Sequence, residues 1–168
     1  MLKLLIKFKY YLLITFCLAA NSVIASEINN SPRSTMYNFL KSMKAYKKDS
    51  SNGLERAKKN LYLDHLGQET KEQTGNLAAK NLINTLDRIE KVDVLNIPKN
   101  PTGKTWVYKK EIIDTPDGQK ELEISIKNYG TNKGWLFSQE TINNIALYYD
   151  SLKSKKIVSC VIELKDWK

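Results

Sequence analysis

A change of hydrophobic period in the middle of the chain constrains the fold more than any other feature. Before Pro98, apolar residues recur at the three- and four-residue spacing of helices, and after Gly103 they alternate with polar residues. Pro98 and the Pro- and Gly-containing segment 101–103 mark a loop between the two patterns. Helices that precede an antiparallel sheet in this way predict an α+β fold.

The first half of the domain predicts three N-terminal helices. Ser31 followed by Pro32 is typical of a helix start, because Ser caps the first turn and Pro fits its first position. Short and long helices are expected over 53–60 and 76–91, with the polar segment 68–75 as an exposed loop between them. Two helical stripes are predicted to face the core: Met36, Phe39, Leu40 and Met43 in the first helix, and Ala79, Leu82, Ile83, Leu86 and Ile89 in the third.

The second half predicts an antiparallel β-meander of about three strands, a C-terminal helix and a short apolar tail over 157–168. The turn signal at 114–118 separates a strand at 106–113 from one in which Leu122, Ile124 and Ile126 alternate with polar residues. We expect that polar side, which includes Glu121, Glu123 and Ser125, to face solvent. A third strand is predicted at 135–137, and Ser138 is expected to cap a helix whose inward stripe is Ile142, Ile145, Ala146, Tyr149 and Leu152.

Residues 1–25 have the pattern of a secretory signal peptide. Three lysines precede an uncharged apolar run over 10–20, and Val23 and Ala25 meet the small-residue rule for cleavage after Ala25. The run is short for a membrane span, which needs about 20 residues, so cleavage is favoured over an uncleaved anchor helix. The sequence therefore predicts a periplasmic protein with one domain over 26–156, and the remaining chain contains no apolar stretch long enough to cross a membrane.

Charge and cysteine content narrow the choice of partners. The formal net charge of +9 comes mainly from dispersed lysines and falls by three if the signal is removed. Because the sequence has no Arg-rich run, we expect no nucleic-acid partner. We do expect the lysines to give a weak attraction to anionic lipid headgroups. Phe16 in front of Cys17 does not fit the small residue that lipidation requires. If the signal segment and its Cys17 are removed, Cys160 is the single cysteine of the exported chain, and no internal disulfide can form.

The sequence contains no recognisable catalytic constellation. His65 is the only histidine, and one His with one distant Cys cannot supply the three protein ligands of catalytic zinc. Asp64 and His65 are adjacent, but no nucleophile elbow accompanies them. Glu121 and Glu123 are expected on a solvent-exposed strand face. We therefore predict no enzymatic activity, no catalytic residue, no metal and no cofactor.

Aromatic residues gather in the second half of the chain. They can pack the sheet against the last helix, which is the simpler interpretation, or they can line a groove for a small ligand or a partner. The candidates for such a groove or partner face are Tyr108, Tyr129, Trp135, Phe137 and Tyr149.

Several short segments between 31 and 152 follow one another in a characteristic order. They are Ser31-Pro32-Arg33-Ser34-Thr35 with Phe39-Leu40, Ala57 through Tyr62-Leu63-Asp64, Leu82 through Leu86-Asp87-Arg88, Val92-Asp93, Thr115-Pro116-Asp117-Gly118, Trp135-Leu136-Phe137-Ser138 and Leu147-Tyr148-Tyr149. Together they resemble the N-terminal extracytoplasmic region that precedes the membrane helices of bacterial small-conductance-type mechanosensitive channels.

The resemblance implies a non-enzymatic periplasmic interaction or sensor module that works with a membrane channel domain of the same or another chain. The motif positions also suggest a structural ion pair among Asp64, Asp87 and Arg88. The sequence as given has no pore segment, so it is not expected to conduct ions by itself. It can be the soluble part of a longer protein, a truncated reading frame or a stand-alone relative. The alternative function is a stand-alone periplasmic protein that binds a small ligand or a lipid in an apolar pocket between sheet and helices.

Overall fold

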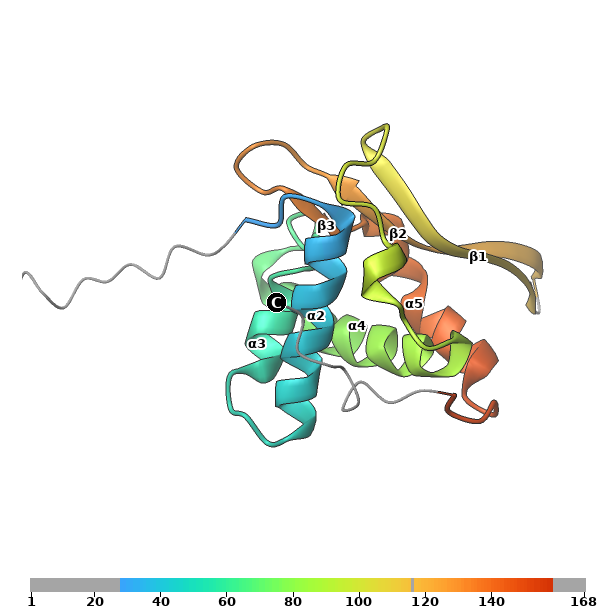
Figure 1. Cartoon of the computed structure of the whole chain (residues 1–168). Coiled ribbons are helices and arrows are strands. Elements are labelled where there is room, and N and C mark those ends of the chain that lie inside the picture. The colour runs from blue at the N-terminus through green and yellow to red at the C-terminus, as the bar shows by residue number, and fades with distance from the viewer. Residues whose placement is uncertain (1–27, 116, 159–168) are drawn as a thin grey trace, which may run out of the picture.

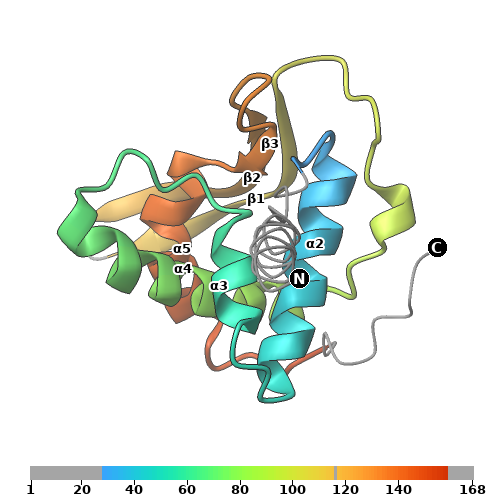
Figure 2. The same cartoon turned by 90° about the vertical axis from the view of Figure 1, so that its left-hand side faces the viewer.

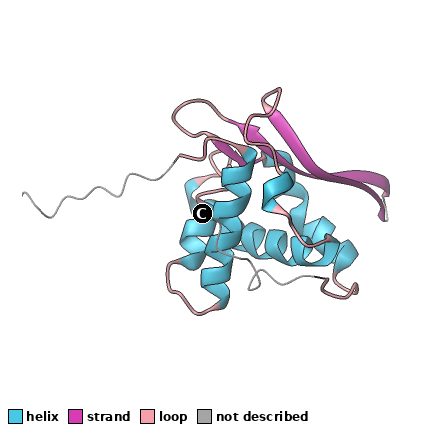
Figure 3. Cartoon of the chain, in the orientation of Figure 1, coloured by secondary structure: helices cyan, strands magenta, loops and turns pink. Residues whose placement is uncertain are grey.

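The fold combines a small antiparallel sheet with helices that cover one of its sides (Figures 1 and 3). The computed structural model describes residues 28–115 and 117–158, so the predicted signal segment, Cys17, Cys160 and most of the predicted tail lie outside the described residues. Within those ranges the chain forms four α-helices, one 3-10 helix and three strands. The predicted α+β class is confirmed.

Helix α2 (Pro32–Lys47) begins at the predicted residues and for the predicted reason. The Ser31 hydroxyl accepts the backbone N–H of Ser34 at 3.1 Å, and the Ser34 hydroxyl accepts the backbone N–H of Ser31 at 3.0 Å. This reciprocal capping satisfies two N–H groups that a helix start leaves unpaired. The stripe predicted for this helix is buried in the core.

Helix α4 (Gln68–Ile89) is longer than the sequence predicted. Helix α3 (Gly53–Lys58) ends close to its predicted end, but residues 68–75, expected as a loop, form the first two turns of α4. This first part of α4 carries no apolar stripe because its side chains mostly face solvent, so the hydrophobic pattern could not reveal it. Gly75 lies inside the helix because a side chain there would meet Leu63 and Lys58.

The sheet has the strand order β1-β2-β3, and both neighbouring pairs are antiparallel. Strands β1 (Thr105–Thr115) and β2 (Gly118–Asn128) pair along their whole length, with one irregularity between Val107 and Lys109. The end of this hairpin projects beyond the helices (Figure 1). The central strand β2 supplies three fully buried side chains to the core: Leu122, Ile124 and Ile126.

Strand β3 (Trp135–Phe137) is short, and the edge that does not face β2 is covered by other segments. The Trp135 N–H donates to the Asn29 carbonyl at 2.9 Å, and the Phe137 N–H donates to the Asn60 carbonyl at 2.8 Å. The Phe137 carbonyl accepts the Tyr62 N–H at 3.0 Å. The backbone groups that an edge strand normally exposes are therefore paired here.

Helix α5 (Gln139–Leu152) follows β3 directly and begins at the predicted cap, Ser138, whose hydroxyl accepts the Thr141 N–H at 3.1 Å. Its predicted inward stripe needs a correction. Tyr148 is 1% exposed, whereas Tyr149 is half-buried and Ala146 is exposed. The Tyr148 hydroxyl donates to Glu111 Oε2 at 2.9 Å, so the helix turns this tyrosine toward β1.

The segment between α4 and β1 is fastened to α2 through the 3-10 helix η1 (Val94–Asn96), which the sequence did not predict. Arg33 donates from Nε to the Ile97 carbonyl at 2.6 Å and from Nη2 to the Leu95 carbonyl at 2.7 Å. Figure 2 shows η1 and the loop that follows it beside α2. Within the described ranges, none of the helices is both long and apolar enough to span a bilayer.

Candidate functional site

Side chains from the segment that follows α3 and from the β2–β3 turn lie together on the surface. In the segment that follows α3, Leu61 and Leu63 are 4% and 7% exposed, so the alternate residues Tyr62 and Asp64 point outward. A parallel bridge between Leu61 and Phe137 fixes this segment against β3. Tyr62 is thereby placed beside Tyr129, which follows the last residue of β2.

The tyrosine rings form a stacked column. The rings of Tyr62 and Tyr129 are parallel to within 5°, with centroids 3.7 Å apart, and His65 stacks on Tyr62 at 5.9 Å and 20°. The Tyr129 hydroxyl accepts the Gln139 N–H at 3.2 Å, which holds the ring at the start of α5. Burial raises the pKa of Tyr129 against the opposing effect of that hydrogen bond, so its hydroxyl stays neutral at physiological pH.

Charged groups surround the column. Asp64 forms ion pairs with Lys133 and with Lys71, whose Nζ lies 2.9 Å from Asp64 Oδ1. Hydrogen bonds from Lys133 and Lys71 lower the pKa of Asp64 to about 2. Lys133 Nζ also lies 5.4 Å from the centroid of the Tyr62 ring, within the range of a cation–π contact. We call the surface of Tyr62, Asp64, His65, Tyr129 and Lys133 the tyrosine face.

A groove of about 680 Å³ adjoins the tyrosine face and runs between α3, the start of α4 and the β2–β3 turn. Its walls carry both signs of charge: Lys58, Lys59, Lys71 and Lys133 oppose Glu55, Asp64 and Glu72. Lys58 is the buried anchor of this set, with Nζ 2.7 Å from both Glu55 and Glu72. The other lysines and the carboxylates are more exposed, so their ion pairs can exchange partners at little cost.

His65 and Asp64, which are adjacent in the chain, have different partners in the structure. His65 Nε2 lies 3.2 Å from Asn143 Oδ1, and Asp64 is held by lysines. The Nδ1 atom of His65 is buried and has no hydrogen-bond partner among the residues that the structure describes. Across 28–115 and 117–158, no three His, Cys, Asp or Glu residues gather so as to hold a metal ion.

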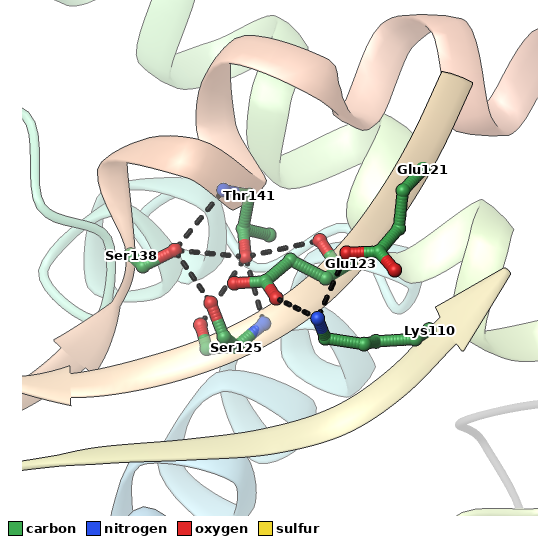
Figure 4. A network of polar contacts seen from close by, with 6 residues as sticks. All are labelled: Lys110, Glu121, Glu123, Ser125, Ser138 and Thr141. Atoms are coloured by element: carbon green, nitrogen blue, oxygen red, sulfur yellow. Dashed lines mark hydrogen bonds and ion pairs between the residues drawn. The ribbon is translucent and has the colours of Figure 1, made fainter. Parts of the chain in front are cut away.

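A separate polar network joins the start of α5 to β2 (Figure 4). The Ser125 N–H donates to Thr141 Oγ1 at 2.8 Å, and the Ser125 and Ser138 hydroxyls are 2.7 Å apart. Ser125 is fully buried, which corrects the prediction that its side of β2 faces solvent throughout. The start of α5 takes the place of a longer β3 along this edge, and its hydroxyls satisfy the backbone of β2.

Two carboxylates hold Lys110 on the neighbouring part of the hairpin. Its Nζ lies 2.8 Å from Glu121 and 3.6 Å from Glu123 (Figure 4). Glu121 is exposed as predicted, and Glu123 is half-buried. The buried hydroxyls of Ser125, Ser138 and Thr141 bond to one another and to the backbone, so this network holds the start of α5 against β2.

The five aromatic residues predicted for a groove do not share one face. Phe137 is fully buried and Trp135 is 6% exposed, so both belong to the core. Tyr108 lies beside Trp106, with ring centroids 5.9 Å apart, and Tyr149 lies under the Arg88 guanidinium at 5.3 Å. Only Tyr129 belongs to the tyrosine face, so the five candidates do not form one groove, and Trp135 and Phe137 pack in the core as the simpler interpretation expects.

The ion pair predicted among Asp64, Asp87 and Arg88 is also corrected. Asp64 pairs with Lys71 and Lys133, and Asp87 pairs with Lys47 at 2.6 Å. Arg88 donates from Nη1 to the Asn84 carbonyl at 2.9 Å. Sequence reasoning missed Tyr62 and Lys133, although the alternation of Leu61, Tyr62 and Leu63 was a signal for an outward tyrosine.

Comparison of the chain with family models, with curated proteins and with solved structures finds no match.

Proposed function

We propose that this chain is a non-enzymatic extracytoplasmic interaction or sensor module that docks on a membrane-bound partner through its tyrosine face. The resemblance to the N-terminal region of small-conductance-type mechanosensitive channels suggests a channel domain of the same or another chain as that partner. The signal-like pattern of residues 1–25 suggests periplasmic export, with contact to the inner membrane. The observation that carries the proposal is the stacked column of Tyr62, Tyr129 and His65 with lysines around it.

This column suits binding better than it suits stability alone. Its tyrosines are only half-buried, and Tyr offers a large apolar surface with a polar tip at low entropic cost. Lys133 contacts both a ring and a carboxylate, and it is 45% exposed. A carboxylate or phosphate of a partner can replace Asp64 on this lysine without breaking a buried ion pair.

Site-specific photocrosslinking in bacterial cells tests the proposal. A photoreactive phenylalanine analogue at Tyr62 should give a discrete adduct in the membrane fraction. The same analogue at Leu77, which is 54% exposed on a part of α4 outside the groove, serves as the matched control. Equal adducts at both positions, or none at Tyr62, would refute docking through the tyrosine face. Cell fractionation with mass analysis of the mature N-terminus tests export and cleavage after Ala25.

The groove favours a second candidate function, the binding of a small ligand or a single lipid. Its volume of about 680 Å³ falls in the range of small-molecule sites, and Leu61, Leu63 and Leu136 add apolar surface to its charged walls. Thermal unfolding with a panel of lipids and small metabolites tests this function. A ligand that raises the melting temperature of the wild type, but not of Leu136→Arg, supports the groove. If no compound shifts the wild type, this second function is rejected.

A further inference from the structure

Strand β1 has one edge on which no strand lies within the described ranges. Its other edge pairs with β2 over the full length of the hairpin. A free edge exposes a row of N–H and C=O groups that can pair with another strand. Short strands, bulges and charges usually protect such an edge, but β1 has eleven residues and only one irregularity, between Val107 and Lys109. The run from Lys109 to Thr115 is regular and available for pairing.

The outward side of this regular run carries a self-complementary pattern. Side chains alternate along a strand, so Lys110, Ile112 and Asp114 lie on one side. Ile112 is 63% exposed, the most exposed of the large apolar side chains in the described residues. A cation, an apolar residue and an anion are thus spaced symmetrically about Ile112.

This pattern selects one antiparallel register for two copies of β1. If the two-fold axis passes through Ile112, Ile112 faces Ile112 of the second copy, and each Lys110 faces an Asp114 across the axis. A two-fold axis through Glu111 would instead place Lys110 opposite Ile112, and an axis through Lys110 would place two lysines face to face. Axes between residues would put opposite sides of the strands together. On the side of the strand that carries Lys110, Ile112 and Asp114, opposite charges therefore match only in the register centred on Ile112.

The two groups that would pair across the axis are accessible in a single copy. Lys110 is 50% exposed, and its three N–H donors allow a further partner beside Glu121 and Glu123. Asp114 is exposed and accepts one long hydrogen bond, from Gln119 Nε2 at 3.3 Å. The additional pairs therefore require no rearrangement of the hairpin.

We infer that β1 pairs with β1 of a second copy, antiparallel about Ile112, to form a symmetric dimer with one continuous six-stranded sheet. The assembly closes at two copies because the outer edge of β3 is already bonded to residues 29 and 60–62. A strand pair alone buries less than the ~1,200 Å² of a stable interface, so the dimer is weak and concentration-dependent. This inference goes beyond the proposed function and uses a different surface from the tyrosine face.

Sedimentation velocity on the purified full chain, from about 5 to about 500 μM, tests for the dimer. We expect the wild type to shift toward a dimer as its concentration rises. Ile112→Asp places two carboxylates on the axis and should weaken the dimer at least about tenfold. Asp114→Lys, which opposes two lysines, should weaken it as well. Circular dichroism checks that both variants fold, which is expected because both positions are exposed.

Single cysteines identify the register. In a Cys17→Ser, Cys160→Ser background, mild oxidation should link Ile112→Cys into a dimer more rapidly than it links Lys110→Cys or Glu111→Cys. A wild type that stays monomeric at every concentration overturns the inference. So does a dimer that Ile112→Asp leaves unchanged, or one that the other two cysteines link equally well. Tyr62 crosslinking is independent of these results, so the proposed function can fail or hold separately.

Discussion

The small sheet has two outer edges, one on β3 (the β3 end, or buried end) and one on β1 (the hairpin end). They differ in how their backbone N–H and C=O groups are hydrogen-bonded. At the β3 end, residues 29 and 60–62 cover the outer edge of the sheet, and its three β3 side chains are at most 9% exposed. At the hairpin end, β1 and β2 are the only strands among the described residues, and Ile112 lies on the surface beside an edge that none of those strands covers. One edge of the sheet, at β3, is therefore part of the core, and the other, at β1, is a surface suited to strand pairing.

This difference shows that edge coverage, more than strand length, decides the role of each strand. Strand β3 has three residues, yet it lies at the centre of the fold because other segments bond to it. Strand β1 has eleven residues and stays peripheral along its regular part. Substitutions at matched positions of the two ends can break or sharpen this comparison.

The largest effect is expected at the buried end from Phe137→Ala. Phe137 is fully buried and meets Phe39 edge to face at 5.2 Å. Truncation leaves a cavity, so the free energy of unfolding should fall by about 3–5 kcal/mol in urea denaturation. Ile112→Ala is the matched control at the hairpin end, and at monomeric concentrations it should change stability by less than about 0.5 kcal/mol. Similar losses at both positions would remove the distinction between the two ends.

The next effect concerns the turn that brings the chain into β3. Gly134 has φ of +68°, and a side chain there would collide with the Asn29 carbonyl. Gly134→Ala should destabilise the protein by about 2–4 kcal/mol, measured as the shift of the urea midpoint. Gly130 has φ of +94° but open space around it, so Gly130→Ala should cost only about 1 kcal/mol. If the two variants were equally stable, contact with Asn29 would not matter.

A smaller effect is expected where α5 covers the edge of β2. Thr141→Val keeps the side-chain shape but leaves the buried Ser125 N–H without its acceptor. The expected loss is about 1–3 kcal/mol, with faster hydrogen exchange at the Ser125 amide. Thr105→Val, at an exposed position of β1, should be nearly neutral. An unchanged exchange rate at Ser125 would show that the hydroxyl does not satisfy this edge.

The smallest effect on stability is expected from the ion pairs of Asp64, which lie on the surface near the buried end. The pKa of Asp64 is lowered from 3.8 to about 2, so its ion pairs stabilise the protein above pH 4, and this contribution is lost as the pH falls toward 2. Because Asp64 is 43% exposed, the contribution should stay below about 1 kcal/mol. Asp64→Asn should therefore be slightly less stable than wild type at pH 6 and should approach it near pH 2. An NMR titration of the Asp64 carboxyl that gives a pKa near 4 would contradict this.

Local patterns predicted most of the elements. The starts of α2 and α5 were predictable because a capping serine acts on N–H groups within the next three residues. The limits of β3 were predicted as well. The start of α4 was not, because a solvent-exposed helical turn has no hydrophobic period. The inward stripe of α5 was predicted with Tyr149 and without Tyr148, because the way α5 packs on the sheet sets which residue meets Glu111.

The sequence by itself determined the α+β class, the serine caps of α2 and α5, and the core stripes of α2 and α4, because these depend on spacing and on hydrogen bonds between near neighbours. The tertiary structure decided the tyrosine face, since the bridge between Leu61 and Phe137 brings the segment of Tyr62 beside Tyr129. It also gave Asp64 two lysine partners, of which Lys133 is distant along the chain. The position of β1 at an edge of the sheet, as the described part of the chain forms it, is likewise a tertiary property, because strand order depends on which segments pair with each strand.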